Sequence, residues 1–309
     1  MADEATVLIT GAAGFVGRHA GRRFAAKGYR VIAAVRSEAG VPAAEGTECY
    51  VCDLTDKRLV REMIARTRPQ YVLHLGGKNS VPDSWSEPLY YIESNVMTTL
   101  HVLDALHACG IKDSRVLVAG SRLKFGLHAP LRPTHPYGLS KSLQEVAALA
   151  WGQLFRLGVM IAEPGNLIGS GPSTGVCSLL ARHIVRMERG ESPPAFSLTK
   201  ANERRDFLDV RDAVDAFELL LRKGADGGVY PVCSGRERSL AELMAGFGKL
   251  TDADLNVRVG PEEGEPSSAD AAPAQPQALW SMGWHAAVPW EQSLRDILDY
   301  FRKEGNLSP

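Results

Sequence analysis

A glycine-rich turn near the N-terminus constrains the fold more than any other feature. Residues 6–10 form a short apolar, β-branched run, and a GxxGxxG pattern follows it with Gly11, Gly14 and Gly17. The first glycine permits a tight turn, the second lets backbone approach a pyrophosphate, and the third lets helix and strand pack closely. Because the pattern lies between a predicted strand and a predicted helix, it indicates a dinucleotide-binding unit.

Strand-like and helix-like segments alternate through the first half of the chain. The predicted strands cover residues 6–10, 30–35, 48–52, 71–75, 115–119 and 159–162, and the predicted helices cover 14–27, 56–67, 93–109 and 137–157. Such alternation is typical of a parallel sheet that helices cover on both faces. The expected fold is therefore α/β, with a Rossmann-type doubly wound parallel sheet.

The second half of the chain has a different character. Loops rich in Gly, Pro and Ser separate predicted helices at 176–188, 210–221, 240–250 and from about residue 290, with a strand at 229–232 and an irregular loop at 260–277. We expect a dinucleotide-binding domain over residues 1–163 and a smaller lobe, mainly substrate-binding, over 164–309. The later part of the chain can contribute one or two further strands to the sheet of the first domain.

Charge and composition exclude several classes of partner. The chain has 35 basic and 36 acidic residues, so it lacks a global field that would concentrate nucleic acid or an anionic membrane. No run approaches the roughly 18 apolar residues of a membrane-spanning helix. The acidic start does not resemble a secretory signal, and five cysteines fit reduced thiols, so we expect a cytoplasmic protein. The eight histidines show no metal-ligand spacing, and no metal is predicted.

A tyrosine and a lysine at the start of a predicted helix carry the expected chemistry. Tyr137 and Lys141 are four residues apart and share a helix face. We expect the ammonium to lower the pKa of the phenol, which can then exchange a proton with a substrate oxygen while hydride moves at the adjacent carbon. Ser121, at the end of a predicted strand, is expected to hydrogen-bond the same oxygen.

Two residues at strand ends bear on the choice of cofactor. Arg36 ends the second predicted strand, where an arginine can pair with a 2′-phosphate, so NADPH is favoured and NADH stays possible. The alternative for Arg36 is a solvated side chain. Asp53, after the third strand, is placed to meet the adenine edge, and a helix cap or turn role fits its spacing equally well.

These residues resemble a known family, the extended short-chain dehydrogenases of the NAD-dependent epimerase/dehydratase type, which act on nucleotide sugars. The resemblance runs nearly end to end. It includes the glycine turn, the Tyr/Lys pair and the segments 52–54, 72–77, 94–96, 164–166 and 205–212. Within the family the chain is similar to the branch of GDP-4-keto-6-deoxy-mannose reductases, through segments 78–85, 232–235 and 282–284.

The resemblance implies the residues of two binding sites. The cofactor site would comprise Gly11, Gly14, Phe15, Val16, Gly17, Arg36, Asp53, Leu54, Leu75, Gly76, Gly77, Lys78, Tyr137, Lys141 and Pro164. The nucleotide-sugar site would comprise Ser80, Val81, Ser121, Asn166 and Arg205. Asn166 would contact the sugar nucleotide, and the guanidinium of Arg205 would bind its diphosphate. The long helices at 93–109 and 137–157 imply a homodimer by analogy.

Three reactions are compatible with this family. A 4,6-dehydratase needs an acid two positions beyond Ser121, and Leu123 stands there, so dehydration is disfavoured. A 4-epimerase uses the same Ser, Tyr and Lys as a reductase, so this set does not separate the two. Arg36 and a dissociable NADPH favour net reduction of a nucleotide-linked 4-keto-6-deoxy sugar. A dinucleotide-binding redox sensor without turnover is a further alternative, against which the intact set of three residues argues.

The chain also departs from the family near the expected sugar pocket. Glu163 stands where the family usually has Arg, and residues 122–125 replace a more acidic pattern. We therefore expect that the sugar can differ from the one that the resemblance names.

Overall fold

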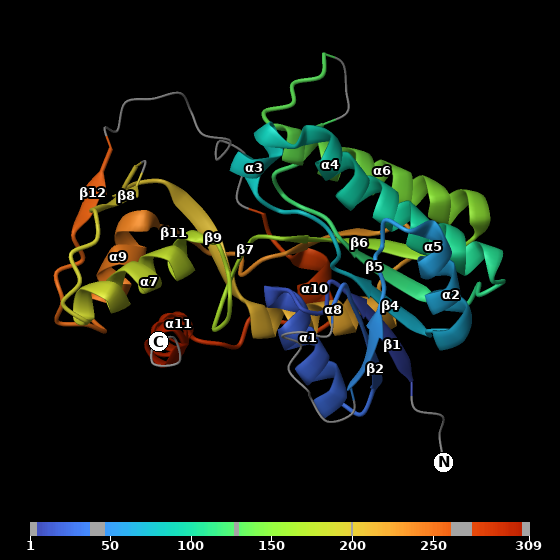
Figure 1. Ribbon diagram of the computed structural model, residues 1–309, viewed down its shortest axis with the longest axis horizontal. Coiled ribbons are helices and arrows are strands. Elements are labelled where there is room, and N and C mark those ends of the chain that lie inside the picture. Colours follow the sequence, from blue (N-terminus) through green and yellow to red (C-terminus); the bar gives the residue numbers. More distant parts are fainter. Residues whose placement is uncertain (1–4, 38–46, 127–129, 199, 261–273, 305–309) are drawn as a thin grey trace. The chain divides into compact units, whose positions relative to one another are not determined.

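The computed structural model describes residues 5–37, 47–126, 130–198, 200–260 and 274–304, and it contains two compact units (Figure 1). Unit 1 consists of Met1–Pro164 and Val214–Pro231, and unit 2 of Gly165–Ala213 and Val232–Pro309, within the described residues. That unit 1 binds the dinucleotide and unit 2 the substrate stays a prediction.

Unit 1 is built on a seven-stranded sheet with the order β10-β6-β5-β4-β1-β2-β3. Its strands are β1 (Thr6–Thr10), β2 (Arg30–Val35), β3 (Thr47–Val51), β4 (Tyr71–His74), β5 (Arg115–Ala119), β6 (Gly158–Pro164) and β10 (Val229–Val232). The pairings from β3 through β6 are all parallel. The strand order reverses beside β1, which makes the β1/β4 boundary the switch point where such sheets bind ligands. The predicted doubly wound α/β fold is confirmed.

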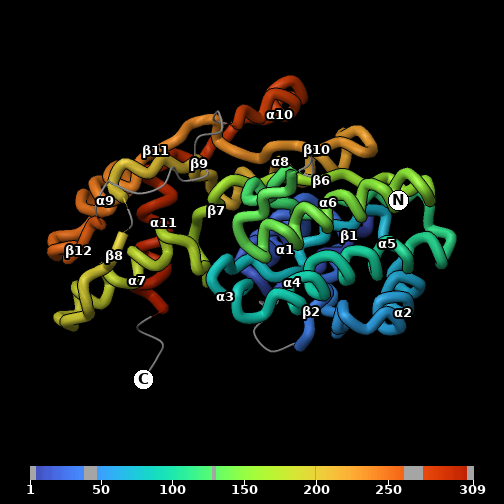
Figure 2. Tube along the Cα trace, turned by 90° about the horizontal axis from the view of Figure 1, so that it is seen from above, coloured from blue at the N-terminus to red at the C-terminus, as the bar shows by residue number. Residues whose placement is uncertain are grey.

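Helices cover both faces of this sheet, and each layer buries an apolar face. Helices α2 (Lys57–Thr67), α5 (Thr98–Ala108) and α6 (Pro136–Phe155) form one layer, and α1 (Phe15–Ala26) lies on the other face (Figures 1 and 2). Beside α1 runs the later part of α8 (Val210–Lys223), joined to it by ion pairs of Arg23 with Asp215 at 2.8 Å and of Lys27 with Glu218 at 3.2 Å. The first layer and the sheet share a core that includes Leu8, Ile32, Met63, Leu103 and Val116.

One predicted helix forms, but its first turn is irregular and further helical structure precedes it. The helix expected at 93–109 is preceded by α3 (Val81–Ser86) and α4 (Pro88–Ile92) and begins with a π-helical turn, η1 (Glu93–Met97), before α5. The hydroxyls of Thr98 and Thr99 donate to the carbonyls of Ser94 and Asn95, each at 2.7 Å. Hydroxyl bonds to carbonyls four residues back disturb a helix, and single π turns are frequent at functional sites.

Unit 2 contains two small sheets and helices around a separate core. The sheets have the orders β11-β9-β7 and β12-β8. Their strands are β7 (Asn166–Ile168), β8 (Phe196–Leu198), β9 (Arg204–Asp209), β11 (Glu237–Ser239) and β12 (Val257–Val259), and the helices are α7 (Val176–Glu188), α9 (Leu240–Gly248), α10 (Gln277–Ser281) and α11 (Trp290–Glu304). The core includes Ile168, Leu180, Phe207, Phe247 and Ile297.

The sequence predicted three of these helices but none of these strands. The irregular loop expected at 260–277 falls mostly on residues 261–273, outside the described residues, and its last position, Gln277, begins α10 instead. Over the part of the chain that the structure describes, none of the helices combines the length and the apolar character needed to cross a membrane.

Two glycines of α1 give a matched test of the close packing at the turn. A Cβ added to Gly17 would lie 2.3 Å from the carbonyl oxygen of Gly11, whereas a Cβ on Gly21 would meet nothing within 4 Å. Gly17→Ala should therefore lower the free energy of unfolding by about 1–3 kcal/mol through overpacking. Gly21→Ala should raise it by up to about 1 kcal/mol, because alanine is the better helix former. Urea unfolding of both variants checks this, and equal effects would contradict it.

Candidate active site

The predicted site residues of unit 1 follow the carboxyl ends of its parallel strands. Gly11 follows β1, Arg36 follows β2, the pair 53–54 follows β3, the segment 75–78 follows β4, and Ser121 follows β5. Pro164 is the last residue of β6. Carboxyl ends of parallel strands lie at one edge of a sheet, so the topology brings these residues to the same edge.

The glycine turn has the geometry that its spacing predicted. Gly11 has a φ of +65°, and a Cβ there would lie 2.9 Å from backbone atoms of Leu75 and Gly76. The end of β1 and the loop after β4 therefore touch through backbone. Gly14 is the N-cap of α1, with no side-chain cap and no acidic residue in the first turn.

These features test whether a dinucleotide fits the turn. The first amides of α1 receive no capping oxygen from a side chain, and the helix end carries partial positive charge. A Cβ on Gly14 would approach only the carbonyl oxygen of Gly11, at 3.2 Å, so one side of this residue is otherwise open. The arrangement suits the pyrophosphate of a dinucleotide.

The three predicted catalytic residues lie buried near the carboxyl ends of these strands: Ser121, Tyr137 and Lys141. All three are buried, with exposed fractions of 6–7%. The Ser121 hydroxyl accepts from the amide of Leu123 at 3.1 Å, and it lies close enough to the Tyr137 phenol to lower the pKa of that group. The Lys141 ammonium donates to the carbonyl of Ala119 at 2.8 Å. A proton donor, a hydroxyl partner and a cation are thus held by β5 and α6.

Burial changes the pKa values of this group in a way that we did not expect. Lys141 was expected to lower the pKa of Tyr137. Instead, burial raises the pKa of the Tyr137 phenol, and the nearby Ser121 hydroxyl only partly opposes this rise. Burial also lowers the pKa of the Lys141 ammonium to about 8. Tyr137 is therefore held as a protonated phenol at neutral pH, which is the form that donates a proton.

Two residues outside the predicted site hold helix α6 in place. The side chain of Asn95 in η1 accepts from the amide of Lys78 at 2.8 Å and donates to the Ser140 hydroxyl at 2.8 Å. It thereby joins the loop after β4 to α6. His135 caps α6, because its Nδ1 accepts from the amide of Gly138 at 2.8 Å, and its ring stacks on Tyr137. The only local sequence signal for either role is the position of His135, directly before the Pro-Tyr pair that begins α6.

His74, at the end of β4, is buried between two hydroxyl groups. Its Nδ1 lies 2.9 Å from the Thr10 Oγ1, and its Nε2 lies 3.0 Å from the Thr99 Oγ1. Burial and the nearby Lys141 charge lower the pKa of His74 to about 3. The imidazole is therefore neutral at physiological pH, which keeps a second positive charge away from Lys141.

Arg36 and Asp53 lie at the ends of neighbouring strands, and both are exposed. Asp53 Oδ1 accepts from the amide and the hydroxyl of Thr55, each at 2.9 Å, and these bonds lower its pKa, with a smaller contribution from the charge of Arg36. Asp53 thus forms a turn of its own, while Asp56 is the N-cap of α2. Whether Asp53 also meets an adenine stays a prediction.

The two departures from the family pattern lie in one ion cluster. The Lys124 ammonium contacts the carboxylates of Glu145 at 2.7 Å and Glu163 at 2.5 Å. Burial raises the pKa of Glu163, and Lys124 opposes this rise. Glu163 also packs near Gly120, directly before Ser121. A lysine where a more acidic pattern is usual therefore compensates a carboxylate where an arginine is usual.

The predicted residues of unit 2 lie on neighbouring strands of its larger sheet. Asn166 begins β7, and its side-chain amide donates to the carbonyl of Asp206 in β9 at 3.1 Å. Arg205, the preceding residue of β9, is partly exposed and pairs with Glu203 at 2.7 Å. Across the antiparallel pair, Arg238 of β11 is directly opposite Arg205.

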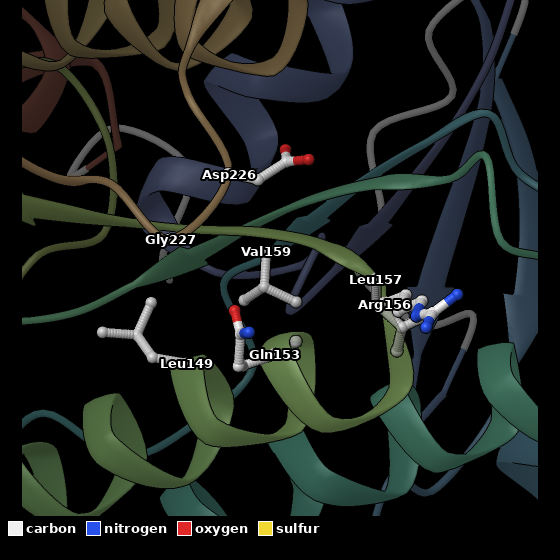
Figure 3. A pocket seen from close by; sticks show the side chains of 8 residues that line it. Leu149, Gln153, Arg156, Leu157, Val159, Asp226 and Gly227 are labelled. Carbon is white, nitrogen blue, oxygen red and sulfur yellow. The ribbon is translucent and has the colours of Figure 1, made fainter.

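A separate pocket of about 300 Å³ lies elsewhere in unit 1 (Figure 3). It is lined by the end of α6, the start of β6 and the loop before β10, including Leu149, Gln153, Arg156 and Asp226. It therefore lies at the amino-terminal ends of these strands and includes none of the predicted site residues. Among the described residues, no group of three or more His, Cys, Asp or Glu side chains could hold a metal ion.

The fold and the arrangement at its switch point are those of a nicotinamide-dependent α/β enzyme. Comparison with known proteins then identifies the family. The chain belongs to the NAD dependent epimerase/dehydratase family, whose model matches residues 7–233. The predicted family is confirmed, and with it the class of NAD(P)-dependent sugar-nucleotide oxidoreductases.

Several relatives match nearly the whole chain. GDP-6-deoxy-D-mannose reductase from Pseudomonas aeruginosa is 29% identical over 94% of this chain and 95% of its own length. The structure of RMD from Pseudomonas aeruginosa complexed with NADPH has a TM-score of 0.78 at 27% identity and covers 97% of this chain and 99% of that one. A Thermus thermophilus UDP-glucose 4-epimerase in complex with NAD has a TM-score of 0.81 at 24% identity, over 96% of this chain and 99% of that one.

The neutral His74 predicts a pH dependence of stability. Its folded pKa of about 3 lies below the unfolded value of about 6.5, so below pH 6.5 the unfolded state binds a proton that the folded state does not. The free energy of unfolding that depends on neutral His74 is therefore fully present above pH 6.5. It decreases as the pH falls, by up to about 1.4 kcal/mol per pH unit. Urea unfolding of His74→Gln between pH 7 and pH 5 should show a shallower loss than the wild type.

The exposed His107 of α5 provides the control. His107→Gln should keep the wild-type dependence on pH. If His74→Gln also kept it, the buried neutral imidazole would not be the source of the acid sensitivity.

Proposed function

We propose that this chain is an NADPH-dependent reductase of a nucleotide-linked 4-keto-6-deoxy sugar. The observation that carries the proposal is the buried group of Ser121, Tyr137 and Lys141 at the same sheet edge as the glycine turn. The relative named GDP-6-deoxy-D-mannose reductase supports it, because the likeness extends over nearly the full length of both chains.

The proton chemistry follows from the burial of the phenol. Bound nicotinamide supplies the hydride that reduces the keto carbon. Tyr137, protonated because burial raises its pKa, donates its proton to the keto oxygen, and the Ser121 hydroxyl hydrogen-bonds the same oxygen. The phenolate that results is stabilised by the Ser121 hydrogen bond and by the positive charge of Lys141, four residues away on α6.

The pKa of Lys141 gives this chemistry an upper pH limit. At pH 7 an ammonium with a pKa of about 8 is mostly charged. Above that pH the charge is lost, and with it the stabilisation of the phenolate. We therefore expect the reduction to slow as the pH rises through about 8.

A 4-epimerase is the second candidate. Epimerases are among the proteins that this chain resembles over nearly its full length, including UDP-glucose 4-epimerase 4 of Oryza sativa subsp. japonica, at 24% identity over 98% of this chain. Reduction is favoured because the exposed Arg36 directly follows β2, where a guanidinium suits a 2′-phosphate. Leu123, at the position of the dehydratase acid, has no ionisable group and therefore argues against dehydration.

The predicted substrate residues define where the nucleotide sugar would bind. We assign Asn166 to the sugar nucleotide and Arg205 to its diphosphate, since a guanidinium can form two parallel hydrogen bonds to phosphate oxygens. Ser80 is the N-cap of α3, and Val81 is its first residue. We expect both to contribute to the sugar pocket. The homodimer and the cytoplasmic location stay predictions.

Removal of the phenol hydroxyl tests the proposal. Tyr137→Phe should lower kcat for NADPH-dependent reduction of a GDP-linked 4-keto-6-deoxy sugar by about 10²- to 10⁴-fold, because the proton donor is lost. KM should change little. The assay follows NADPH absorbance over a panel of GDP-, UDP- and dTDP-linked keto sugars.

The control is Tyr71→Phe, at the amino-terminal end of β4, which should keep wild-type activity. Unchanged turnover in Tyr137→Phe would rule out the proposed acid. Purified protein that retains stoichiometric NAD and interconverts sugar epimers without net NADPH oxidation would favour the epimerase instead.

The cofactor preference is tested at Arg36. Arg36→Ala should raise KM for NADPH about tenfold, a loss of about 1.4 kcal/mol, and leave KM for NADH nearly unchanged. The control is Arg30→Ala, which changes an exposed arginine at the other end of the same strand, paired with Glu48. Equal effects of Arg36→Ala on both cofactors would contradict recognition of the 2′-phosphate.

A further inference from the structure

Lys141 has a buried partner that the proposed chemistry does not use. Gln144 lies three residues further along α6 and is 1% exposed. Its Oε1 accepts a hydrogen bond from the Lys141 ammonium at 2.9 Å. Its Nε2 donates to the Thr99 hydroxyl of α5 at 2.8 Å. The amide therefore connects the ammonium to the neighbouring helix.

The connection continues from Thr99 to the glycine turn. Thr99 donates its hydroxyl proton to the carbonyl of Asn95 at 2.7 Å, so it accepts from both Gln144 and His74. Thr10 Oγ1 accepts from the amides of Leu75 and Gly76 at 3.1 and 3.0 Å. The Thr10 proton is then left for Nδ1 of His74, whose Nε2 carries the proton that Thr99 accepts.

This network permits only one orientation of the Gln144 amide. With the amide turned around, its NH₂ group would face the Lys141 ammonium, donor against donor. Its oxygen would face the Thr99 hydroxyl, whose proton is already donated to Asn95. An isolated glutamine would be free to turn, but this one is fixed by hydrogen bonds that end at Thr10 of β1.

The lysine uses two of its three N–H groups within this arrangement. One donates to the carbonyl of Ala119 and one to Gln144. The third has no partner among the residues that the structure describes. Two fixed acceptors, one on β5 and one on α6, therefore define the direction of the ammonium.

We propose that Gln144 is a positioning residue, which holds the Lys141 ammonium so that its third N–H serves the bound reactants. The proposal rests on the proposed function, in which Lys141 stabilises the phenolate of Tyr137. Thr99, His74 and Thr10 act on Lys141 only indirectly, because they fix the orientation of the Gln144 amide. The alternative is that Gln144 only fills space between α5 and α6.

Two substitutions of Gln144 separate these roles by their opposite effects on Lys141. Gln144→Glu places a carboxylate beside the ammonium and should raise its pKa from about 8 by about one pH unit or more. Gln144→Leu removes the acceptor and should lower it. Among the described residues, His74 of β4 is the titratable group whose pKa responds to the charge of Lys141. Tyr137 lies one turn before Lys141 on α6, and Tyr91 of α4 packs against Tyr137. Both substitutions leave these groups in place.

The pH profile of kcat provides the first measurement. The fall in activity at alkaline pH should move upward in Gln144→Glu and downward in Gln144→Leu, with kcat of the latter lower by about 10- to 100-fold at pH 7 and KM changed by less than about threefold. Thr99→Val keeps the acceptor on Gln144 but removes its anchor. It should lower kcat less than Gln144→Leu and leave the alkaline limb near its wild-type position.

A second measurement does not need turnover. The ¹⁵N signal of the Lys141 ammonium, assigned by its loss in Lys141→Arg, should titrate at a higher pH in Gln144→Glu and at a lower pH in Gln144→Leu. If this signal titrates at the same pH in all three proteins, the positioning role is wrong, whatever the activity. If the titrations shift but the wild type reduces no keto sugar, the proposed function fails and the positioning of Lys141 by Gln144 stands.

Discussion

The hydroxyl of Thr10 joins the two strands on which the site depends. It accepts hydrogen bonds from the backbone amides of Leu75 and Gly76, so the end of β1 and the loop after β4 are fixed to each other. Gly11 follows at once, and its missing side chain lets the two backbones approach to a distance that a Cβ would not allow. This junction fixes the glycine turn and the loop after β4. Through His74 it is also connected to Thr99, and from Thr99 through Gln144 to Lys141.

Local sequence patterns were sufficient to predict the parts of the site that depend on neighbours in the chain. The glycine spacing required a strand before it and a helix after it, and both are present. Tyr137 and Lys141 share a helix face because they are four residues apart. The parallel sheet then places Ser121 at the same edge, since β5 lies beside β4 and β6. These predictions needed only helical periodicity, strand alternation and sheet topology.

Other features depend on contacts between distant segments, and the sequence does not specify these. Gln144 became relevant only when α5 placed Thr99 beside it, and the role of Asn95 arises from a π-helical turn against the loop after β4. The three-residue strands of unit 2 are too short to show alternation. The pKa of Tyr137 was expected to be lowered by the charge of Lys141. Burial raises it instead, and the sequence does not show how deeply this side chain is buried. In the sequence, Lys124 and Glu163 are two separate departures from the family pattern, and the structure shows that they form an ion pair.

Transfer of label from the cofactor to the sugar tests this account most directly. The protein would be incubated with NADPH that carries deuterium in the transferable C4 position of the nicotinamide, together with a nucleotide-linked 4-keto-6-deoxy sugar. Mass spectrometry of the product should find one deuterium in the sugar for each NADP⁺ released. An unlabelled sugar, with the deuterium still on unoxidised cofactor, would contradict reduction at this site.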